Sequence, residues 1–466
     1  MKKINFFLNN PYIYLFLIFI LWFLVLGYSF FNEPFIWDDL HLVRKYSSNE
    51  LLSVWFGSWD PDGYETPSYR PIAVLFYHSL ASIFGENVQS QRLFIFLLLY
   101  LLFILVAKLL NKLNFNNTEI FFILLLLVFS KIFTTLASWI TISHLIFCYI
   151  LLLLSLINYL NWLEENKTPF LIFSFLFAIA SILTREEVYF IPPLIFLLGL
   201  YYADFTKKNL IKIFVTSIFY FFLVVVHYYL RSIFTEGAPT LGFAYRSFLS
   251  HLLQSGLPGG WFPSLVKITF FQILWIFVVF FSSLILLINI NKIRIIDIKK
   301  LIILFLIIVI TSSPSLVSAR AFGIFIPTIF SLSLIIKIFF INKINSNKFL
   351  HNKFFSKISL SILIILIFSG ILGGYLRSNE HLKSINQHSI YIVAFDTSFI
   401  FNKKYKNISI PEDRKKQKKL YLENLGINKY VSIDEIKKKL LNKEISNKIY
   451  IPNFHPLSPN FKPLLR

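Results

Sequence analysis

Charged residues are scarce in this chain of 466 residues and make up only 15% of it. A soluble domain averages about 25% charged and about 45–50% apolar residues. Here 56% of the residues are hydrophobic and the mean hydropathy is +0.67. Apolar runs close to the roughly 20 residues that span a bilayer core recur along most of the chain. These features exclude a soluble enzyme and a disordered chain, and they predict an integral, multi-pass membrane protein.

Cysteine and several well-known catalytic motifs are also missing. The single cysteine, Cys148, lies in an apolar run, so an intrachain disulfide is excluded. We find no His, Asp and Glu spacing that specifies a metal site, no glycine-rich phosphate loop and no nucleophile elbow. The net charge of +21 comes with no nucleic-acid-binding motif, so no nucleic-acid partner is expected.

Apolar runs predict about eleven membrane-spanning helices. They cover 12–31, 92–110, 119–137, 141–160, 169–184, 188–202, 210–230, 267–290, 300–312, 321–341 and 358–376. The first run has no small-residue cleavage site after it, so we interpret it as an uncleaved signal-anchor. With the N-terminus in the cytoplasm, the cytoplasmic connections hold 17 basic and 5 acidic residues, and the outer connections hold 11 of each. The positive-inside rule favours this orientation.

The chain divides into a membrane module, 1–377, and a basic C-terminal tail, 378–466. The tail holds 17 Lys and Arg against 8 Asp and Glu. A strand-like run at 389–395 and two helical stretches after it predict a small α/β domain. An odd number of spans places this domain outside. Its charge is interpreted as a solvated basic face that can rest on anionic headgroups.

The first outer loop, 32–91, carries eight of the 16 acidic residues of the membrane module. Asp38 and Asp39 directly follow the first span. A carboxylate at the membrane surface can take the proton of an attacking hydroxyl, so this pair is a candidate for general-base chemistry. The alternative is a solvated acidic loop with an Asp helix cap. Later in the loop, Pro71 suits the first turn of a helix and predicts an amphipathic interfacial helix over 71–84.

Ionisable residues also stand at the outer ends of other expected spans. They are His144, Arg185, Glu186, Glu187, Arg231 and Arg320. Charge at membrane depth is costly and marks a functional or a paired site. Guanidinium groups bind phosphate oxygens bidentately, so the arginines opposite an acidic pair indicate a phosphate clamp with a base. The alternatives are that each arginine reaches the headgroups or pairs with Glu186 or Glu187, and that His144 is a packed or capping residue.

The order of these motifs resembles the GT-C superfamily of polytopic glycosyltransferases, such as the protein O-mannosyltransferases and the aminoarabinose transferases. The matching elements are Asp38-Asp39, Tyr69-Arg70-Pro71, Thr184-Arg185-Glu186-Glu187 with Pro192, and Arg320. Two positions depart from the family pattern: Arg185 replaces the usual Lys, and Ala321 replaces an aromatic residue after Arg320. The resemblance covers the membrane module and not the tail.

The resemblance implies an all-helical membrane module that transfers a sugar, with inversion, from a polyprenyl-phosphate donor to an acceptor hydroxyl outside the plasma membrane of a bacterium. It implies Asp38 as base, and Asp39 orienting the acceptor or a divalent cation, although the two can exchange roles. Arg185 and Arg320 would hold the donor phosphate, supported by Arg70 and Arg231. The acceptor or supporting residues would be Glu186, Glu187, His144 and Tyr69. No metal ligand is assigned, and no cofactor is certain.

Three other functions compete with this interpretation. A transporter or flippase for lipid-linked sugars would place ionisable residues near the midplane of its helices. A polymerase of lipid-linked glycans also uses outer arginines but typically has its large loop later in the chain. A structural membrane subunit would have no use for eight acids in one loop. The sequence leaves open whether the acceptor is a glycan, a lipid or a protein.

Overall fold

The computed structural model describes residues 11–31, 42–60, 68–85, 87–138, 140–203, 206–235, 277–286, 295–316, 325–340, 360–372 and 375. Within these ranges the chain is mostly helical and contains no strand. The prediction of a mostly helical protein is therefore confirmed for these residues. The expected C-terminal α/β domain lies outside the described residues, as do Asp38, Asp39 and Arg320.

The helices follow the apolar runs of the sequence. In chain order they are α2 (Pro11–Trp22), the π-helical turn η1 (Phe23–Gly27), α3 (Tyr28–Phe31), α5 (Ser48–Ser53), α6 (Pro71–Phe84), α7 (Val88–Lys112), α8 (Asn117–Val128), α9 (Lys131–Ser138), α10 (Ser143–Glu165), α11 (Thr168–Thr184), η2 (Glu186–Val188), α12 (Ile191–Tyr202), α13 (Lys207–Phe234), α16 (Ile295–Thr311), η4 (Ser313–Leu316) and α17 (Phe325–Phe340). Two further apolar helices cover Phe277–Leu286 and Leu360–Leu372.

Within the residues that the structure describes, three helices, α7, α10 and α13, are long and apolar enough to cross a membrane. Each of the eleven expected spans overlaps a described apolar helix, and the described α-helices at the other eight positions have fewer than 18 residues. One expected span, 119–137, is divided into α8 and α9 at Phe129 and Ser130. The membrane character of the chain thus has support in the structure, while the number of spans remains a prediction.

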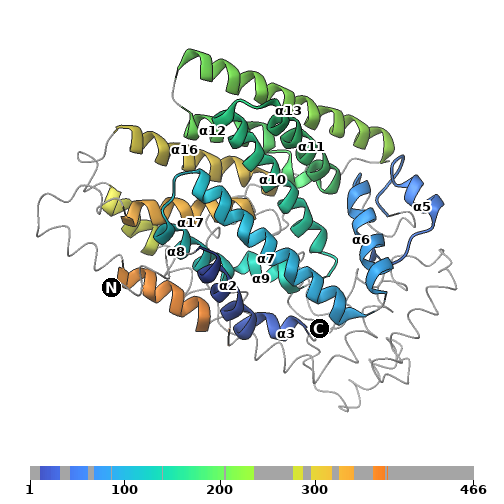
Figure 1. The fold of residues 1–466 in the computed structure, drawn as a ribbon, viewed down its shortest axis with the longest axis horizontal. Helices are drawn as coiled ribbons and strands as arrows, with labels where there is room; N and C mark the ends of the chain where they lie inside the picture. The colour runs from blue at the N-terminus through green and yellow to red at the C-terminus, as the bar shows by residue number, and fades with distance from the viewer. Residues whose placement is uncertain are drawn as a thin grey trace, which may run out of the picture.

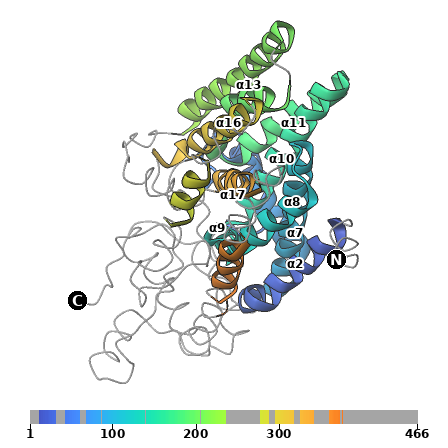
Figure 2. The ribbon, with the colours of Figure 1, turned by 90° about the vertical axis from the view of Figure 1, so that its left-hand side faces the viewer.

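Helix α10 lies at the centre of the bundle and α13 at its periphery. Helix α10 packs mainly against α11 and α7, and the other tight pairs are α12 with α13 and α16 with α17 (Figure 1). The second view agrees, since α13 again forms the outer edge beyond α11 and α16 (Figure 2). In the most apolar window of each helix, 83% of α10 is buried but only 28% of α13. A face that is apolar yet exposed is what lipid contact requires.

The described part of the first outer loop packs onto the bundle through α6. Pro71 occupies the first turn of this helix, as predicted, because the missing proline N–H has no intrahelical partner there anyway. Gly85 ends the helix with a φ of 58°, a conformation that favours glycine. The buried face of α6, with Val74 and Tyr77, forms a small core with Val54 and Trp59. This second core fixes the loop against the membrane helices.

Candidate functional site

Four elements meet at one end of the bundle and form a polar cluster. They are the start of α6, the start of α10, the turn η2 after α11, and the last turns of α13. Seven of the ten candidate residues chosen from the sequence lie on these elements: Tyr69, Arg70, His144, Arg185, Glu186, Glu187 and Arg231. Arg70 and Glu186, two of these residues, contact each other across 116 positions of sequence.

Arg70 and Glu186 form a two-pronged ion pair that joins the outer loop to η2. Arg70 Nε donates to Glu186 Oε2 and Arg70 Nη2 donates to Glu186 Oε1, both at 2.6 Å. The hydroxyl of Ser68 also donates to Oε1, at 3.4 Å. The Arg70 guanidinium lies 4.7 Å from the centre of the Trp59 ring, and its residue is only 3% exposed. This geometry is the bidentate arrangement that gives arginine its specificity for carboxylates.

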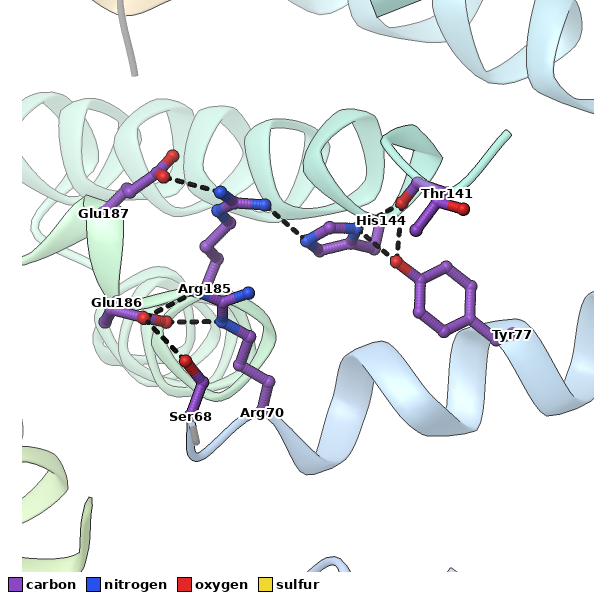
Figure 3. A network of polar contacts seen from close by, with 8 residues as sticks. All are labelled: Ser68, Arg70, Tyr77, Thr141, His144, Arg185, Glu186 and Glu187. Atoms are coloured by element: carbon purple, nitrogen blue, oxygen red, sulfur yellow. Dashed lines mark hydrogen bonds and ion pairs between the residues drawn. The ribbon is translucent and has the colours of Figure 1, made fainter. Parts of the chain in front are cut away.

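Arg185 is held between two partners on opposite sides of its guanidinium. Its Nη2 donates to Glu187 Oε1 at 2.6 Å, and its Nη1 donates to His144 Nε2 at 2.7 Å. The extended side chain runs from η2 across to α10 (Figure 3). Arg70 is therefore paired with Glu186, and Arg185 with Glu187. Pairing with these two glutamates is one of the alternatives to phosphate binding that the sequence left open.

The contacts of His144 define its tautomer. A guanidinium has donors only, so Nε2 of His144 must accept and the ring proton lies on Nδ1. Nδ1 is 2.6 Å from the backbone carbonyl of Thr141 and 2.6 Å from the Tyr77 hydroxyl (Figure 3). The Tyr77 hydroxyl in turn donates to the Thr141 carbonyl at 2.5 Å. His144 is thus a neutral ring that links Arg185 to α6.

Charge pairing sets the titration of the Glu186 carboxyl. Burial alone would raise its pKa, but the charge and hydrogen bonds of Arg70, with Arg185 and Arg231 nearby, hold that pKa well below its ordinary value. Burial alone would lower the pKa of Arg70, but Glu186, followed by Glu187, raises it above its ordinary value. Both groups are therefore charged throughout the physiological range.

A second group of side chains lies beside this pair and involves α13. The imidazole of His227 lies between two tyrosine rings, with ring centres 5.4 Å from Tyr69 and 5.5 Å from Tyr189. Its Nδ1 is 2.6 Å from the Tyr189 hydroxyl. The guanidinium of Arg231 lies next to the same hydroxyl. The Tyr69 hydroxyl donates to the carbonyl of Trp55 at 3.1 Å, which ties this group to the outer loop.

The structure adds residues that the sequence analysis did not select. Tyr77, Tyr189 and His227 make the hydrogen bonds described above, and Trp59 stacks on Arg70. Asp60, directly after Trp59, is a loop carboxylate that is only 2% exposed. The sequence signal available for Asp60 was an acid directly after Trp59 in a loop rich in aromatic residues. Its burial is notable because a buried carboxylate needs a specific environment. In contrast, nothing in the local sequence distinguishes the two tyrosines from core residues.

Lysine-rich contacts occupy the opposite end of the helices. The end of α10 carries Glu164, which pairs with Lys112 at 2.5 Å. Lys337 at the end of α17 pairs with the buried Glu119 at 2.7 Å. Helix α10 has 23 residues at about 1.5 Å each, so this end is roughly 30 Å from His144. The assignment of these two ends to the two sides of a membrane remains a prediction from the sequence.

No metal site is evident in the part of the chain that the structure describes, because no three His, Cys, Asp or Glu side chains converge there. Asp38, Asp39 and Arg320 lie outside that part, so their expected approach to Arg185 remains a prediction.

Comparison with known protein families and with curated proteins finds no match for this chain. A functional assignment must therefore come from the residues of the site. The described part of the chain is helical and includes three helices able to cross a membrane by length and composition. The polar cluster at one end of these helices is the candidate site.

Proposed function

We propose that this protein is a membrane glycosyltransferase that moves a sugar from a polyprenyl-phosphate donor to an acceptor hydroxyl on the extracytoplasmic face. The observation that carries the proposal is the meeting of Tyr69-Arg70 and Arg185-Glu186-Glu187, whose members contact one another across 116 positions of sequence. Ionisable side chains gathered at the ends of membrane helices by default mark a functional site. The same motifs carry the resemblance to the GT-C superfamily.

The proposed reaction is a single displacement. The acceptor oxygen forms a bond to the anomeric carbon while the bond from that carbon to the phosphate oxygen breaks, and a carboxylate takes the hydroxyl proton. The leaving phosphate is already a good anion, so positive charge can replace a general acid. Asp38 is the proposed base, and Asp39 is proposed to orient the acceptor or a divalent cation.

Ion pairing divides the arginines between two proposed roles. Arg70 and Arg185 each have a glutamate partner, so we assign them to holding the outer loop and η2 in place. We assign the contact with the donor phosphate to the other two arginines, Arg231 and Arg320. The ion pairs described above lie at the ends of helices. Their position favours chemistry at the membrane surface over transport, because a transporter needs polar groups near the midplane of the membrane.

Sugar transfer from a polyprenyl-phosphate donor in isolated membranes tests the proposal. We expect Asp38→Asn to abolish transfer while the amount of inserted protein stays near that of the wild type. Glu165→Gln, a charge removal at the exposed opposite end of α10, is the matched control and should leave transfer unchanged. If Asp38→Asn and Asp39→Asn both retain full activity, the general-base assignment is wrong. If the wild type transfers no sugar from any such donor, the proposed function is wrong.

A further inference from the structure

Helices α10 and α11 are joined along their interface by buried hydroxyl and thiol groups as well as by apolar packing. Nearer the polar cluster, Ser181 Oγ donates to the Cys148 carbonyl at 3.0 Å, and Cys148 Sγ donates to the Ser181 carbonyl at 3.4 Å. Further along, Ser155 Oγ donates to the Ser174 carbonyl at 2.8 Å, and Ser174 Oγ donates to the Ser155 carbonyl at 2.6 Å. All four side chains are buried. These four residues form a ladder of two rungs, and each rung is a reciprocal pair.

The hydrogen bond between His144 and Arg185 lies in the same register as the ladder (Figure 3). The first rung is reached by going four residues forward in α10, to Cys148, and four residues back in α11, to Ser181. The second rung is seven residues further in each helix. Seven residues are close to two helical turns, so the rungs lie on one face of each helix. The antiparallel pairing is therefore continuous from the cluster to the second rung.

Apolar packing alone determines the register of this helix pair only weakly. Both helices are rich in leucine, isoleucine and phenylalanine, including the run Leu151–Leu154, and apolar contacts are non-directional. A slide of one residue moves the end of a helix by about 1.5 Å. Because Glu187 holds the Arg185 guanidinium on the η2 side, that slide would stretch its 2.7 Å hydrogen bond to His144. Buried polar contacts are satisfied in one register only, which is how they set register in coiled coils.

We propose that the ladder is a positioning device, which fixes the register of α10 against α11 so that His144 meets the guanidinium of Arg185. The four ladder residues are thus positioning residues for a cluster that they do not enter. Hydroxyl groups that bond across helices and small side chains that allow close approach are both typical of membrane helix interfaces. The alternative is that the rungs only add adhesion while apolar packing sets the register. The inference concerns the assembly of the cluster, so it does not depend on sugar transfer.

The register can be measured directly because the chain has a single cysteine. Ser181→Cys places a second sulfur where the native oxygen is 3.4 Å from Cys148 Sγ. Oxidation with copper phenanthroline in membranes should join the two sulfurs. The loss of thiols that react with a polyethylene-glycol maleimide after unfolding in SDS measures the rate. Ala178→Cys and Thr184→Cys, about one turn to either side, should cross-link at least about tenfold more slowly, because a disulfide needs Cα atoms within about 7 Å.

Removing the second rung tests whether the ladder sets the register. Ser174 Oγ also lies 2.6 Å from the Tyr220 hydroxyl, so Tyr220→Phe accompanies the change and avoids an unpaired buried donor. In the triple variant Ser155→Ala, Ser174→Ala, Tyr220→Phe, the preference for position 181 should fall from about tenfold to about threefold or less. Ser155→Ala alone, which leaves no donor unpaired, is the milder variant and should give an intermediate preference. The matched control, which should keep the tenfold preference, removes three buried hydroxyls that donate within their own helices: Ser217→Ala, Ser282→Ala and Ser333→Ala.

Coupling to the cluster separates positioning from adhesion. His144 and Ser155 are eleven residues apart on α10, or about 16 Å, and changes at that distance with no shared partner usually add. We expect His144→Phe to lower the melting temperature of the otherwise native full-length chain in detergent. In the triple variant the same change should lower it by about half as much or less, because the contact with Arg185 is already weakened. In the control with three altered serines, the loss should be undiminished.

The outcomes decide between positioning and adhesion. A loss of the preference for position 181 in the triple variant, together with a smaller effect of His144→Phe there, supports the proposal. A preference that survives in the triple variant and in Ser155→Ala leaves only adhesion and overturns it. A His144→Phe loss of the same size in all backgrounds overturns it as well. Fastest cross-linking at position 178 or 184 in the otherwise native chain overturns the register itself.

Discussion

At the residue scale, the main feature of the site is a buried charge pair that links two distant segments. Arg70 and Glu186 satisfy each other through two hydrogen bonds, and the Arg70 guanidinium lies over the Trp59 ring. Taking such a pair out of water is expensive, and only good geometry makes the cost tolerable. Removing one partner therefore leaves the other charge buried and unpaired.

We expect Arg70→Met to lower the stability of the protein by about 3–5 kcal/mol, because Glu186 then loses both hydrogen bonds of its ion pair while its charge stays largely buried. The double variant Arg70→Met with Glu186→Leu should recover most of that loss, since it removes both charges and keeps the volume filled. Thermal unfolding in detergent measures both variants. A double variant that is less stable than Arg70→Met alone would contradict the assignment of a structural ion pair.

Acid pH should weaken the contribution of the same pair. The folded protein holds the pKa of Glu186 well below 4.5, its ordinary value, so the stabilisation is fully present above pH 4.5. It is lost as the pH falls through the folded pKa, because the carboxyl is then protonated in both states. The difference in melting temperature between the wild type and Glu186→Gln should therefore be constant near neutral pH and shrink well below pH 4.5. A difference that grows toward acid pH would contradict this sign.

At the element scale, close helix packing depends on a few small residues. Gly199 on α12 lies where a Cβ atom would be 2.5 Å from the Tyr159 hydroxyl on α10 and 2.8 Å from Ile213 on α13. Tyr159 and Ile213 are both buried, so neither has free space into which to move. The glycine is what allows α12 to approach both helices, which resembles the use of small residues at other membrane helix interfaces.

We predict that Gly199→Ala destabilises the bundle by about 1–3 kcal/mol, the usual cost of overpacking. The better helix propensity of alanine, about 1 kcal/mol, offsets part of this loss. The melting temperature in detergent is the measurement. Gly57→Ala is the matched control, because its added Cβ would meet only a backbone oxygen at 3.3 Å. Equal melting temperatures for Gly199→Ala and the wild type would show that the helices can move apart to accommodate the added methyl group with no loss of stability.

At the scale of the whole molecule, the described ion pairs lie in two groups, one at each end of the helices. The cluster around Arg70 and Arg185 occupies one end, and the lysine pairs around Glu164 and Glu119 occupy the other. By the positive-inside rule, we expect the lysine end to face the cytoplasm. This orientation is required if the donor is a lipid-linked sugar on the outer face.

Single-cysteine labelling tests this orientation. The native Cys148 is fully buried and should remain unlabelled. Phe56→Cys stands in the first outer loop, where the native side chain is 67% exposed, and should react with a membrane-impermeant maleimide on intact cells. Lys167→Cys, between α10 and α11, should react only after the membrane is permeabilised. Labelling in the reverse pattern would invert the topology and remove the site from the outer face.

Local sequence determined where most of the described helices lie and which residues are candidates for the site. The helix that starts at Pro71 and ends near Phe84 was predicted because the proline position and apolar spacing are local signals. Apolar length likewise predicted α7, α10 and α13. Even the alternative roles of Arg185 were visible, since Glu186 and Glu187 follow it directly in the chain.

Only the tertiary structure decided which side chains contact one another. From the sequence alone, Glu186 and Glu187 could each form an ion pair with several arginines. In the folded protein, Glu186 pairs with Arg70 and Glu187 pairs with Arg185. That choice depends on how α6 packs against α11, because contacts across more than a hundred residues are not encoded in any local pattern. The same packing places His227 between two tyrosines, Tyr69 and Tyr189. Residue types, spacing and hydrophobic length are local quantities, whereas pairing is a property of the packed bundle.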